Sequence, residues 1–439
     1  MVIYLKKVII LVAYLGLCIN YIYFSASLSA QETQQSTPED LGISSFRLQR
    51  VENLIENAIE NQVIAGAVAL IARHGEIALL DSYGMADINN NQPMQNNSIF
   101  RIASMTKPIT SLAIMMLYEE GHFFLNDPIS LFLPELANLR VLSKQGNDFD
   151  LIESNKDITI RQLLTHTSGI SYKFISNTER RMHLAQLYSA AEISDGLSET
   201  NEKISDLSQK LGTLPLLFEP GSEYAYGLSI DVLGHLIEVI SGLTLAEFFE
   251  TKIFQPLGMT DTHFYIEEPK ISRLAALYTP SEEGTILEVT ERVEKEFISF
   301  SPTYHQSEIQ KYYSGGAGLV STALDYFRLL QMFLNGGELD GVRLLSPTTV
   351  KMMTRNNIGS LNVSPGIKFG LGFAVVEEPS MVGDSKTQGT YYWGGIFNTR
   401  FFVDPNHELI GIFLSQRIPG DVERLRDKFI NIVYQSTIQ

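Results

Sequence analysis

Cysteine is nearly absent from this chain, since Cys18 is the only one among 439 residues. A single cysteine excludes an internal disulfide, and a thiol nucleophile would have to be Cys18 itself. Cys18 follows Leu17, whereas a lipid-modified cysteine follows a small residue, so we do not expect lipidation. No H-E-x-x-H or paired-histidine spacing occurs either, so the sequence predicts no metal site.

Positive charge is also scarce. The chain has 33 Lys and Arg residues against 50 Asp and Glu, a formal net charge of -17. Nucleic-acid binding requires an excess of Lys and Arg to neutralise phosphates. Because no basic run or glycine-rich phosphate loop offsets the deficit, we expect no nucleic-acid partner.

The first thirty residues contain no acidic side chain. They carry Lys6 and Lys7, then a long apolar stretch, then small residues that end at Ala30. This order is typical of a secretory signal peptide, residues 1–30, with Ser29 and Ala26 as alternative ends. We therefore expect a secreted or periplasmic protein. The alternative is an uncleaved anchor with transient membrane association, because the apolar stretch is long enough to span a tilted membrane.

The remaining chain, residues 45–439, follows a polar segment at 31–44 that we interpret as a linker. Apolar spacing predicts helices at both ends of it, and two strand hairpins, one turning at His74-Gly75 and one at Asp404-Pro405-Asn406. Further helices are predicted in the middle of the chain, in 104–118, 159–169, 230–242 and 321–337. Residues 171–215 and 263–310 show little pattern and are interpreted as loops or lids.

This order predicts an α+β fold in which one antiparallel sheet is flanked by helices from both ends of the chain. The α/β part takes residues 45–103 and 315–439. A helical insertion takes 104–314, and the cleft between the two parts is expected to hold Ser104.

Ser104 and Lys107 stand three residues apart in the apolar stretch "RIASMTKPIT", so they share one face of the predicted helix. A serine hydroxyl is a weak nucleophile until a base removes its proton. Lysine is normally protonated, with a pKa of about 10.4, but burial can lower that pKa by several units. A buried S-x-x-K can therefore carry a nucleophile with its own base, although the motif alone is weak.

Four further segments strengthen that interpretation: "TIRQLLTHTSGI", "EPGSEYAYGLSIDVLG", "SGGAGLVSTALDYF" and the wider sequence around Ser104. Taken in this order, they resemble the class C β-lactamase-like superfamily of serine hydrolases over residues 45–435. The superfamily includes D,D-peptidases, D-aminopeptidases and family VIII carboxylesterases. The resemblance implies the β-lactamase/D,D-peptidase-like fold with an all-helical insertion domain, Ser104 as nucleophile, Lys107 as base and no cofactor.

The superfamily's second motif is Tyr-x-Asn, which here is matched by Tyr226, Gly227 and Leu228. Tyr224 is a rival, but the distance from Tyr226 to "DVLG" fits the superfamily better. The resemblance makes Tyr226 the proton relay, hydrogen-bonded to Lys107. Leu228 replaces the asparagine that would hold a substrate amide. The lone His166 is interpreted as structural.

The third motif is normally Lys-Thr-Gly or His-Thr-Gly, and this chain has Trp393, Gly394 and Gly395 at that point. Trp-Gly-Gly resembles the family VIII carboxylesterases, and the glycines allow substrate to approach the strand closely. The resemblance places the backbone N–H groups of Ser104 and Ile396 in an oxyanion hole. We expect Leu228, Trp393, Gly394 and Gly395 to contact the substrate.

These departures favour a neutral substrate. The usual Lys or His of the third motif helps to bind a substrate carboxylate, and Trp393 cannot. The sequence therefore predicts an esterase on small neutral esters. A D,D-peptidase, D-aminopeptidase or weak β-lactamase remains an alternative, with Arg400 as a replacement cation. A penicillin-binding-like protein without turnover is another.

Overall fold

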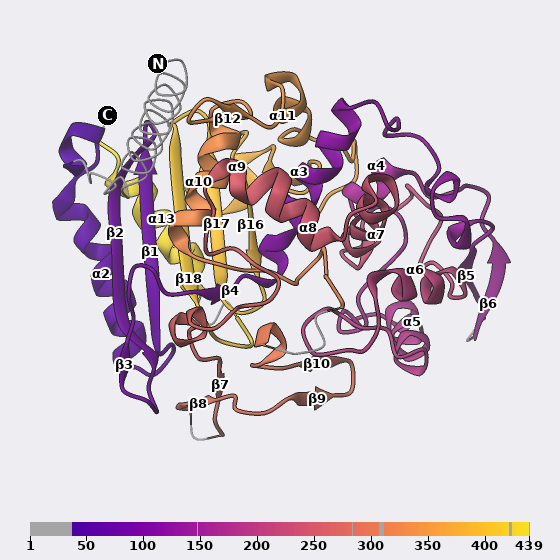
Figure 1. The fold of residues 1–439 in the computed structure, drawn as a ribbon, viewed down its shortest axis with the longest axis horizontal. Helices are drawn as coiled ribbons and strands as arrows, with labels where there is room; N and C mark the ends of the chain where they lie inside the picture. Colours follow the sequence, from indigo (N-terminus) through magenta and orange to yellow (C-terminus); the bar gives the residue numbers. More distant parts are fainter. Residues whose placement is uncertain (1–36, 147, 283, 307–310, 421–423, 439) are drawn as a thin grey trace, which may run out of the picture.

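An eight-stranded antiparallel sheet forms the centre of the computed structural model, which describes residues 37–146, 148–282, 284–306, 311–420 and 424–438 (Figure 1). An early strand and the last strand of the chain lie side by side within it, because β1 pairs with β18 and Ala67 lies opposite Ser415. The order across the sheet is β14 (Ile367–Phe369), β15 (Ala374–Val376), β16 (Tyr391–Gly395), β17 (Thr399–Asp404), β18 (Leu409–Ser415), β1 (Gly66–Arg73), β2 (Glu76–Asp87) and β3 (Gln92–Pro93). The predicted antiparallel sheet is confirmed.

Both predicted hairpins are present. His74 and Gly75, which have φ of 55° and 84°, turn the chain between β1 and β2. Asp404 ends β17, and its carboxylate accepts hydrogen bonds from the backbone N–H groups of Asn406 and His407 in the second turn. Asp and Asn stabilise turns through such contacts with nearby backbone groups.

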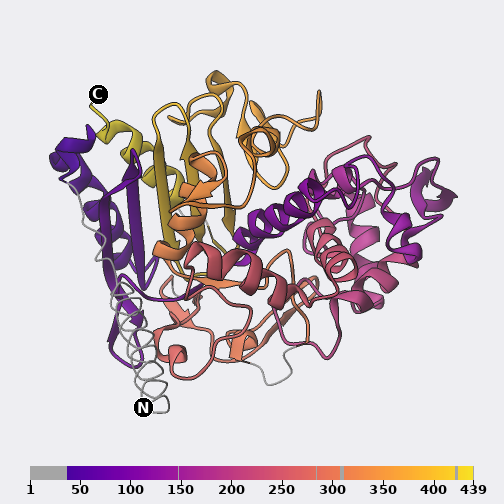
Figure 2. The ribbon, with the colours of Figure 1, turned by 45° about the horizontal axis from the view of Figure 1, so that its top comes forward.

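Helices α2 (Ser45–Glu60) and α13 (Leu425–Ser436) cover one face of the sheet (Figures 1 and 2). Alternate residues of β1 point toward them, with Ala67, Ala69 and Ile71 in the same buried cluster as the two helices. The intervening residues of β1 enter the larger cluster on the other face. Every residue of β1 is therefore buried.

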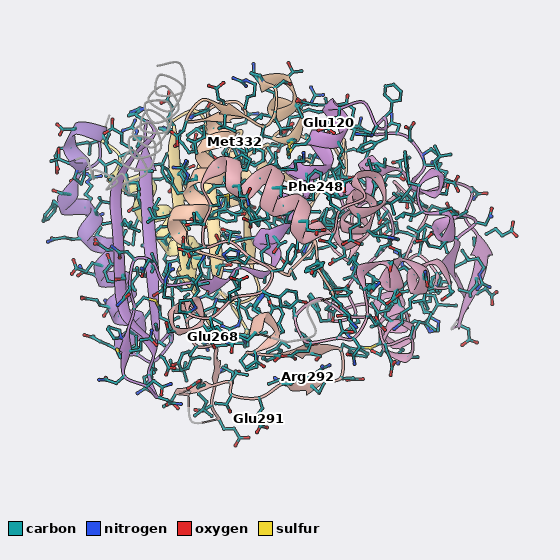
Figure 3. The ribbon with its side chains drawn as sticks, in the orientation of Figure 1. Glu120, Phe248, Glu268, Glu291, Arg292 and Met332 are labelled. Carbon is teal, nitrogen blue, oxygen red and sulfur yellow. The ribbon has the colours of Figure 1, made fainter. Side chains whose placement is uncertain are left out.

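Helix α10 (Ala323–Leu334) packs on the opposite face, against β1 and β18. Figure 3 shows the buried Met332 of α10 and Phe248 in the interior, whereas the exposed Glu291 and Arg292 lie at the lower rim. The other helices are α3 (Thr106–Glu119), α4 (Ile160–Leu164), α5 (Glu179–Ala190), α6 (Ile204–Gly212), α7 (Ser229–Ser241), α8 (Leu245–Phe249), α9 (Gln255–Leu257), α11 (Pro347–Met353) and α12 (Pro379–Val382).

The insertion is not purely helical, which corrects one part of the expected fold. It also carries three two-stranded hairpins, formed by β5 (Arg140–Gln145) with β6 (Asp148–Glu153), β7 (Tyr278–Pro280) with β8 (Ile286–Glu288), and β9 (Val293–Lys295) with β10 (Ile298–Phe300). The first hairpin turns at Gly146, whose φ of 63° favours glycine. Helices α5 and α6 lie in a region that we interpreted as loop. The predicted boundaries at residues 104 and 314 stay a prediction.

Part of the expected linker packs against the core. Residues Pro38–Leu41 form a short 3-10 helix, and Leu41 and Ile43 are buried beside α2 and α13. The linker interpretation is therefore wrong for residues 38–44, because the Leu41 and Ile43 side chains pack against α2 and α13. The predicted signal peptide and Cys18 lie outside the described residues.

No single helix of the described residues is long and apolar enough to cross a membrane. The segments Ser229–Ser241 and Leu245–Leu257 meet that criterion only when taken together, and they are bent by 80°.

The helical layer on the sheet supplies a test of stability. Phe429 of α13 is fully buried, with its ring centroid 5.6 Å from that of Phe413. Phe429→Ala should lower the free energy of unfolding by about 3–5 kcal/mol in urea denaturation, because it leaves a cavity. Phe46→Ala on α2 is the control, since Phe46 is 75% exposed. Equal effects of the two substitutions would contradict the layer described above.

Candidate active site

Ser104 lies in a 3-10 turn (η2, Ala103–Met105) that leads into α3. From Arg101 to Met115, all of them described, it is the one residue that is not buried. The preceding Ala103 is fully buried and has φ of 42°, in the left-handed region that strains a residue with a Cβ. Backbone strain of this kind gathers at functional sites, where the surrounding structure holds it in place. The turn thus presents one half-buried hydroxyl from an otherwise buried segment.

Lys107 stands one turn later on α3 and is 1% exposed. Its Nζ lies 3.3 Å from Ser104 Oγ, 2.9 Å from the Tyr172 hydroxyl and 2.8 Å from the Gly316 carbonyl oxygen. The Gly316 carbonyl oxygen only accepts hydrogen bonds, so it takes one N–H of Lys107. A neutral amine with two N–H groups can donate to Gly316 and Tyr172 and keep its lone pair for the Ser104 proton.

Tyr172 is the residue at this site that the sequence analysis missed. Burial, together with the nearby Tyr226, Asp231 and other ionisable groups, holds the pKa of Tyr172 well above its usual value. Its hydroxyl is therefore protonated at neutral pH. Tyr172 stands six residues after His166 in "HTSGISY", two residues beyond the segment "TIRQLLTHTSGI", and its closeness to that segment is the only sequence signal for it.

Tyr226 is close to Lys107, but its contact differs from the expected one. Lys107 Nζ lies 4.7 Å from the centre of the Tyr226 ring, which is cation–π geometry for a charged lysine. The Tyr226 hydroxyl accepts a hydrogen bond of 3.4 Å from Trp393 Nε1. Among the hydrogen bonds of the described residues, none joins Lys107 to Tyr226, so the expected hydrogen bond is replaced by the one to Tyr172.

The rival Tyr224 packs against Phe369, with ring centroids 5.6 Å apart. Its buried hydroxyl has no hydrogen-bond partner among the described residues. Of the two tyrosines, Tyr226 is the one whose ring contacts Lys107.

His166 is fully buried and packs edge-on against Tyr226, with ring centroids 4.8 Å apart. Its Nδ1 accepts the backbone N–H of Gly227 at 3.4 Å. Burial, and secondarily the charge of Lys107, hold the pKa of His166 well below its usual value. The ring is therefore neutral and supports Tyr226, in line with a structural role.

Strand β16 brings the third motif to the same place. A Cβ on Gly395 would lie 2.4 Å from the carbonyl oxygen of Ile102, so only glycine lets this strand lie against the turn that carries Ser104. The half-buried Ile396 packs in one cluster with Ala103. Trp393 is half-buried against Tyr226 and Phe369, with ring centroids 5.2 Å and 5.3 Å away.

Two residues that we expected at the substrate are placed elsewhere. Leu228 is fully buried in the main core, just before α7, so its side chain is not exposed to a substrate. Gly394 faces the α13 side of the sheet, where a Cβ would lie 3.3 Å from Arg400 and 3.4 Å from Arg426. Successive residues of a strand point to opposite faces, which separates Gly394 from Trp393 and Gly395.

Arg400 also lies on the α13 side. Its guanidinium binds Asp427 of α13 at 3.3 Å and lies 5.0 Å from the centre of the Tyr392 ring. It therefore does not supply the cation that the third motif lacks. Among the described residues, no group of three His, Cys, Asp or Glu side chains is arranged to hold a metal ion.

Comparisons with known proteins agree with this geometry. The family model described as Beta-lactamase matches residues 51–435. Esterase EstB of Burkholderia gladioli is 32% identical over 81% of this chain and 86% of its own length. Lovastatin esterase of Penicillium rubens is 30% identical over 76% of this chain and 84% of its own length.

A solved structure described as "EstCE1, a hydrolase with promiscuous acyltransferase activity" superposes with a TM-score of 0.76. It is 29% identical and covers 88% of this chain and 98% of its own. Simvastatin synthase of Aspergillus terreus shares the fold, with a TM-score of 0.72 at 24% identity.

The hydrogen bond between Lys107 and Tyr172 gives a test of the site. Tyr172→Phe should lower kcat/KM for an ester by about ten- to a hundred-fold, the usual cost of losing a hydrogen bond to a charged or reacting group. Tyr434→Phe is the control, because it removes a buried hydroxyl that donates to Asp404 on the other side of the sheet. An unchanged kcat/KM in Tyr172→Phe would show that this hydroxyl does not serve Lys107.

Proposed function

The chain belongs to the beta-lactamase family of serine hydrolases, and we propose that it acts as an esterase on small neutral esters through an acyl-enzyme on Ser104. One observation carries the proposal: the buried Lys107 amine lies 3.3 Å from the half-buried Ser104 hydroxyl. A general base must lie within hydrogen-bond reach of the proton that it removes, and this distance is slightly longer than the usual range, as is common before substrate binds.

In the first step Ser104 Oγ attacks the ester carbonyl carbon while Lys107 Nζ takes the hydroxyl proton. The tetrahedral intermediate then collapses, its bond to the alkoxy oxygen breaks, and that oxygen leaves as an alcohol with the proton returned from Lys107. We keep Tyr226 as the proposed relay for this proton, because its ring covers Lys107 and its hydroxyl lies beside Trp393. Tyr172 holds Lys107 in place during both transfers.

In the second step water attacks the acyl-enzyme and gives its proton to Lys107, and the bond between the acyl carbon and Ser104 Oγ breaks. The acid is released and Ser104 regains its proton. The negative charge on the carbonyl oxygen needs hydrogen-bond donors in both steps. We propose the backbone N–H groups of Ser104 and Ile396, and the packing of Ile396 beside Ala103 supports this pair.

The aromatic side chains near Lys107 support the proposed substrate class. Trp393 and Tyr226 offer aromatic surface, and Arg400 points to the other face of the sheet. Among the curated relatives, two carry esterase names. An apolar site that Arg400 does not reach favours a neutral acyl group over a carboxylate-bearing one.

We also keep the proposal that the protein is exported to the periplasm or secreted. It rests on the composition of residues 1–30, where two lysines precede a long apolar stretch.

The roles of the nucleophile and base can be tested with p-nitrophenyl butyrate. Ser104→Ala should reduce kcat by on the order of a thousand-fold or more, as for other nucleophile knockouts. Lys107→Arg should be as inactive as Lys107→Ala, because arginine stays charged and cannot act as a base. Arg328→Lys is the control for an Arg/Lys exchange, since that side chain binds Asp340 at the surface. An active Lys107→Arg enzyme would show that only a positive charge is needed.

The substrate class is tested by comparing p-nitrophenyl butyrate with nitrocefin. We expect kcat/KM to favour the ester by a hundred-fold or more, because the guanidinium groups beside β16, those of Arg400 and Arg426, lie on its α13 side and do not reach the substrate carboxylate of nitrocefin. Arg400→Ala should leave both values nearly unchanged, since Arg400 is bound to Asp427. If nitrocefin is the better substrate and Arg400→Ala removes that activity alone, the protein is a β-lactamase with a relocated cation.

A further inference from the structure

A buried carboxyl group is linked to Lys107 through the backbone of Gly316. Asp231 stands in the first turn of α7 and is fully buried. Its Oδ1 accepts hydrogen bonds from the Ser314 hydroxyl at 2.5 Å and from the Gly316 N–H at 3.1 Å. Its Oδ2 has no hydrogen-bond partner among the described residues. A buried carboxylate oxygen without a partner is costly, so its retention calls for an explanation.

Gly316 connects this carboxyl group to the lysine. Its N–H donates to Asp231, and its carbonyl oxygen accepts from Lys107 Nζ at 2.8 Å. A Cβ on Gly316 would lie 2.3 Å from Asp231 Oδ2 and 3.2 Å from the Tyr172 hydroxyl oxygen. Asp231, Tyr172 and Lys107 therefore surround one glycine, and only a residue without a side chain fits between them.

Burial and the charges around this glycine shift the pKa of Asp231 in opposite directions. Burial is the largest effect and holds the pKa of Asp231 above its usual value, although the Lys107 charge and the hydrogen bonds from Ser314 and Gly316 oppose the rise. Burial raises the pKa of the neighbouring Asp195 to about 7, with Lys173 opposing and Asp231 adding to the effect. The other ionisable groups that face Lys107 or Asp231 are the side chains of Tyr172, Tyr226, Tyr312 and His166. Among these groups, Lys107 is the cation whose charge lowers the pKa of Asp231.

We propose that Asp231 is a positioning residue for Lys107: through Gly316 it fixes the carbonyl oxygen that binds the amine, and its carboxylate charge stabilises the ammonium form of Lys107. The inference rests on the proposed function of Ser104 and Lys107. It extends that function by assigning a role to a residue that touches neither substrate nor reacting atoms.

The sign of the effect follows from electrostatics. A negative charge stabilises the ammonium form of a nearby lysine. Only the neutral amine can take the Ser104 proton, so reactivity should rise with pH as Lys107 loses its proton. Removal of the Asp231 charge makes the neutral amine available at lower pH. The acid limb of the pH profile, where the rate rises with pH, should then shift to lower pH.

The experiment measures the rate at which a fluorophosphonate labels Ser104 between pH 4 and pH 9, together with kcat/KM for p-nitrophenyl butyrate. Asp231→Asn keeps an oxygen for Ser314 and Gly316 but removes the charge. We expect its acid limb to lie lower than that of the wild-type protein by roughly one pH unit or more. A residue that only supports the fold would lower the rate at every pH without moving the limb.

Asp325→Asn is the matched control. Asp325 is also a buried carboxyl group in the first turn of a helix, with its pKa raised to about 6 by burial, and it accepts hydrogen bonds from Asp261 and Thr262. Its substitution should leave the limb in place. If Asp231→Asn does not fold, Ser314→Ala is the alternative test, because it removes a hydroxyl that stabilises the Asp231 anion. This substitution should also shift the acid limb to lower pH, by a smaller amount.

The two proposals fail in different ways. A wild-type protein that is not labelled at any pH overturns Ser104 as nucleophile, and this inference with it. A wild-type protein that is labelled normally, with an acid limb that stays in place or moves toward higher pH in Asp231→Asn, overturns the role of Asp231 alone.

Discussion

The burial of the Lys107 amine is the constraint on which the rest of the site depends. An amine that is 1% exposed has little water to bind, so the protein must supply its hydrogen-bond partners. The three partners are oxygens of Ser104, Tyr172 and Gly316, which come from three separate parts of the chain. Ser104 lies just before α3, Tyr172 belongs to the insertion, and Gly316 lies where the chain returns to the sheet. The Lys107 side chain thus joins three distant segments of the chain around Ser104, the proposed nucleophile.

Two glycines and one strained alanine follow from the same constraint. Gly316 lies between Lys107, Tyr172 and Asp231, and Gly395 lets β16 reach the backbone of Ile102, where a side chain on either glycine would collide. Ala103, at a φ of 42°, turns the chain so that only Ser104 leaves the buried segment. Strain at one residue is tolerated because the packed sheet and helix on either side leave no relaxed alternative.

Features that depend on a local pattern of residues are predicted well from the sequence. Apolar runs interrupted by turn residues identified both hairpins, and hence the antiparallel sheet, while the three-residue spacing paired Ser104 with Lys107. The sequence predicts poorly the contacts between distant segments: nothing in the pattern selects Tyr172 among 19 tyrosines, because its role depends on where the insertion folds back. Leu228 and Gly394 were misplaced for a related reason. A motif gives their position along the chain, but burial and the face of the strand decide which way they point.

The aromatic rings beside Lys107 have two contacts that bear on the site. The ring faces of Tyr226 and Tyr172 lie 4.7 Å and 5.2 Å from Nζ, which is the geometry of a cation–π contact. The Tyr226 ring also packs against Trp393, with ring centroids 5.2 Å apart. The ring that contacts the proposed base therefore also forms part of the aromatic surface beside it, so the proposed base and the proposed preference for a neutral substrate depend on one set of side chains.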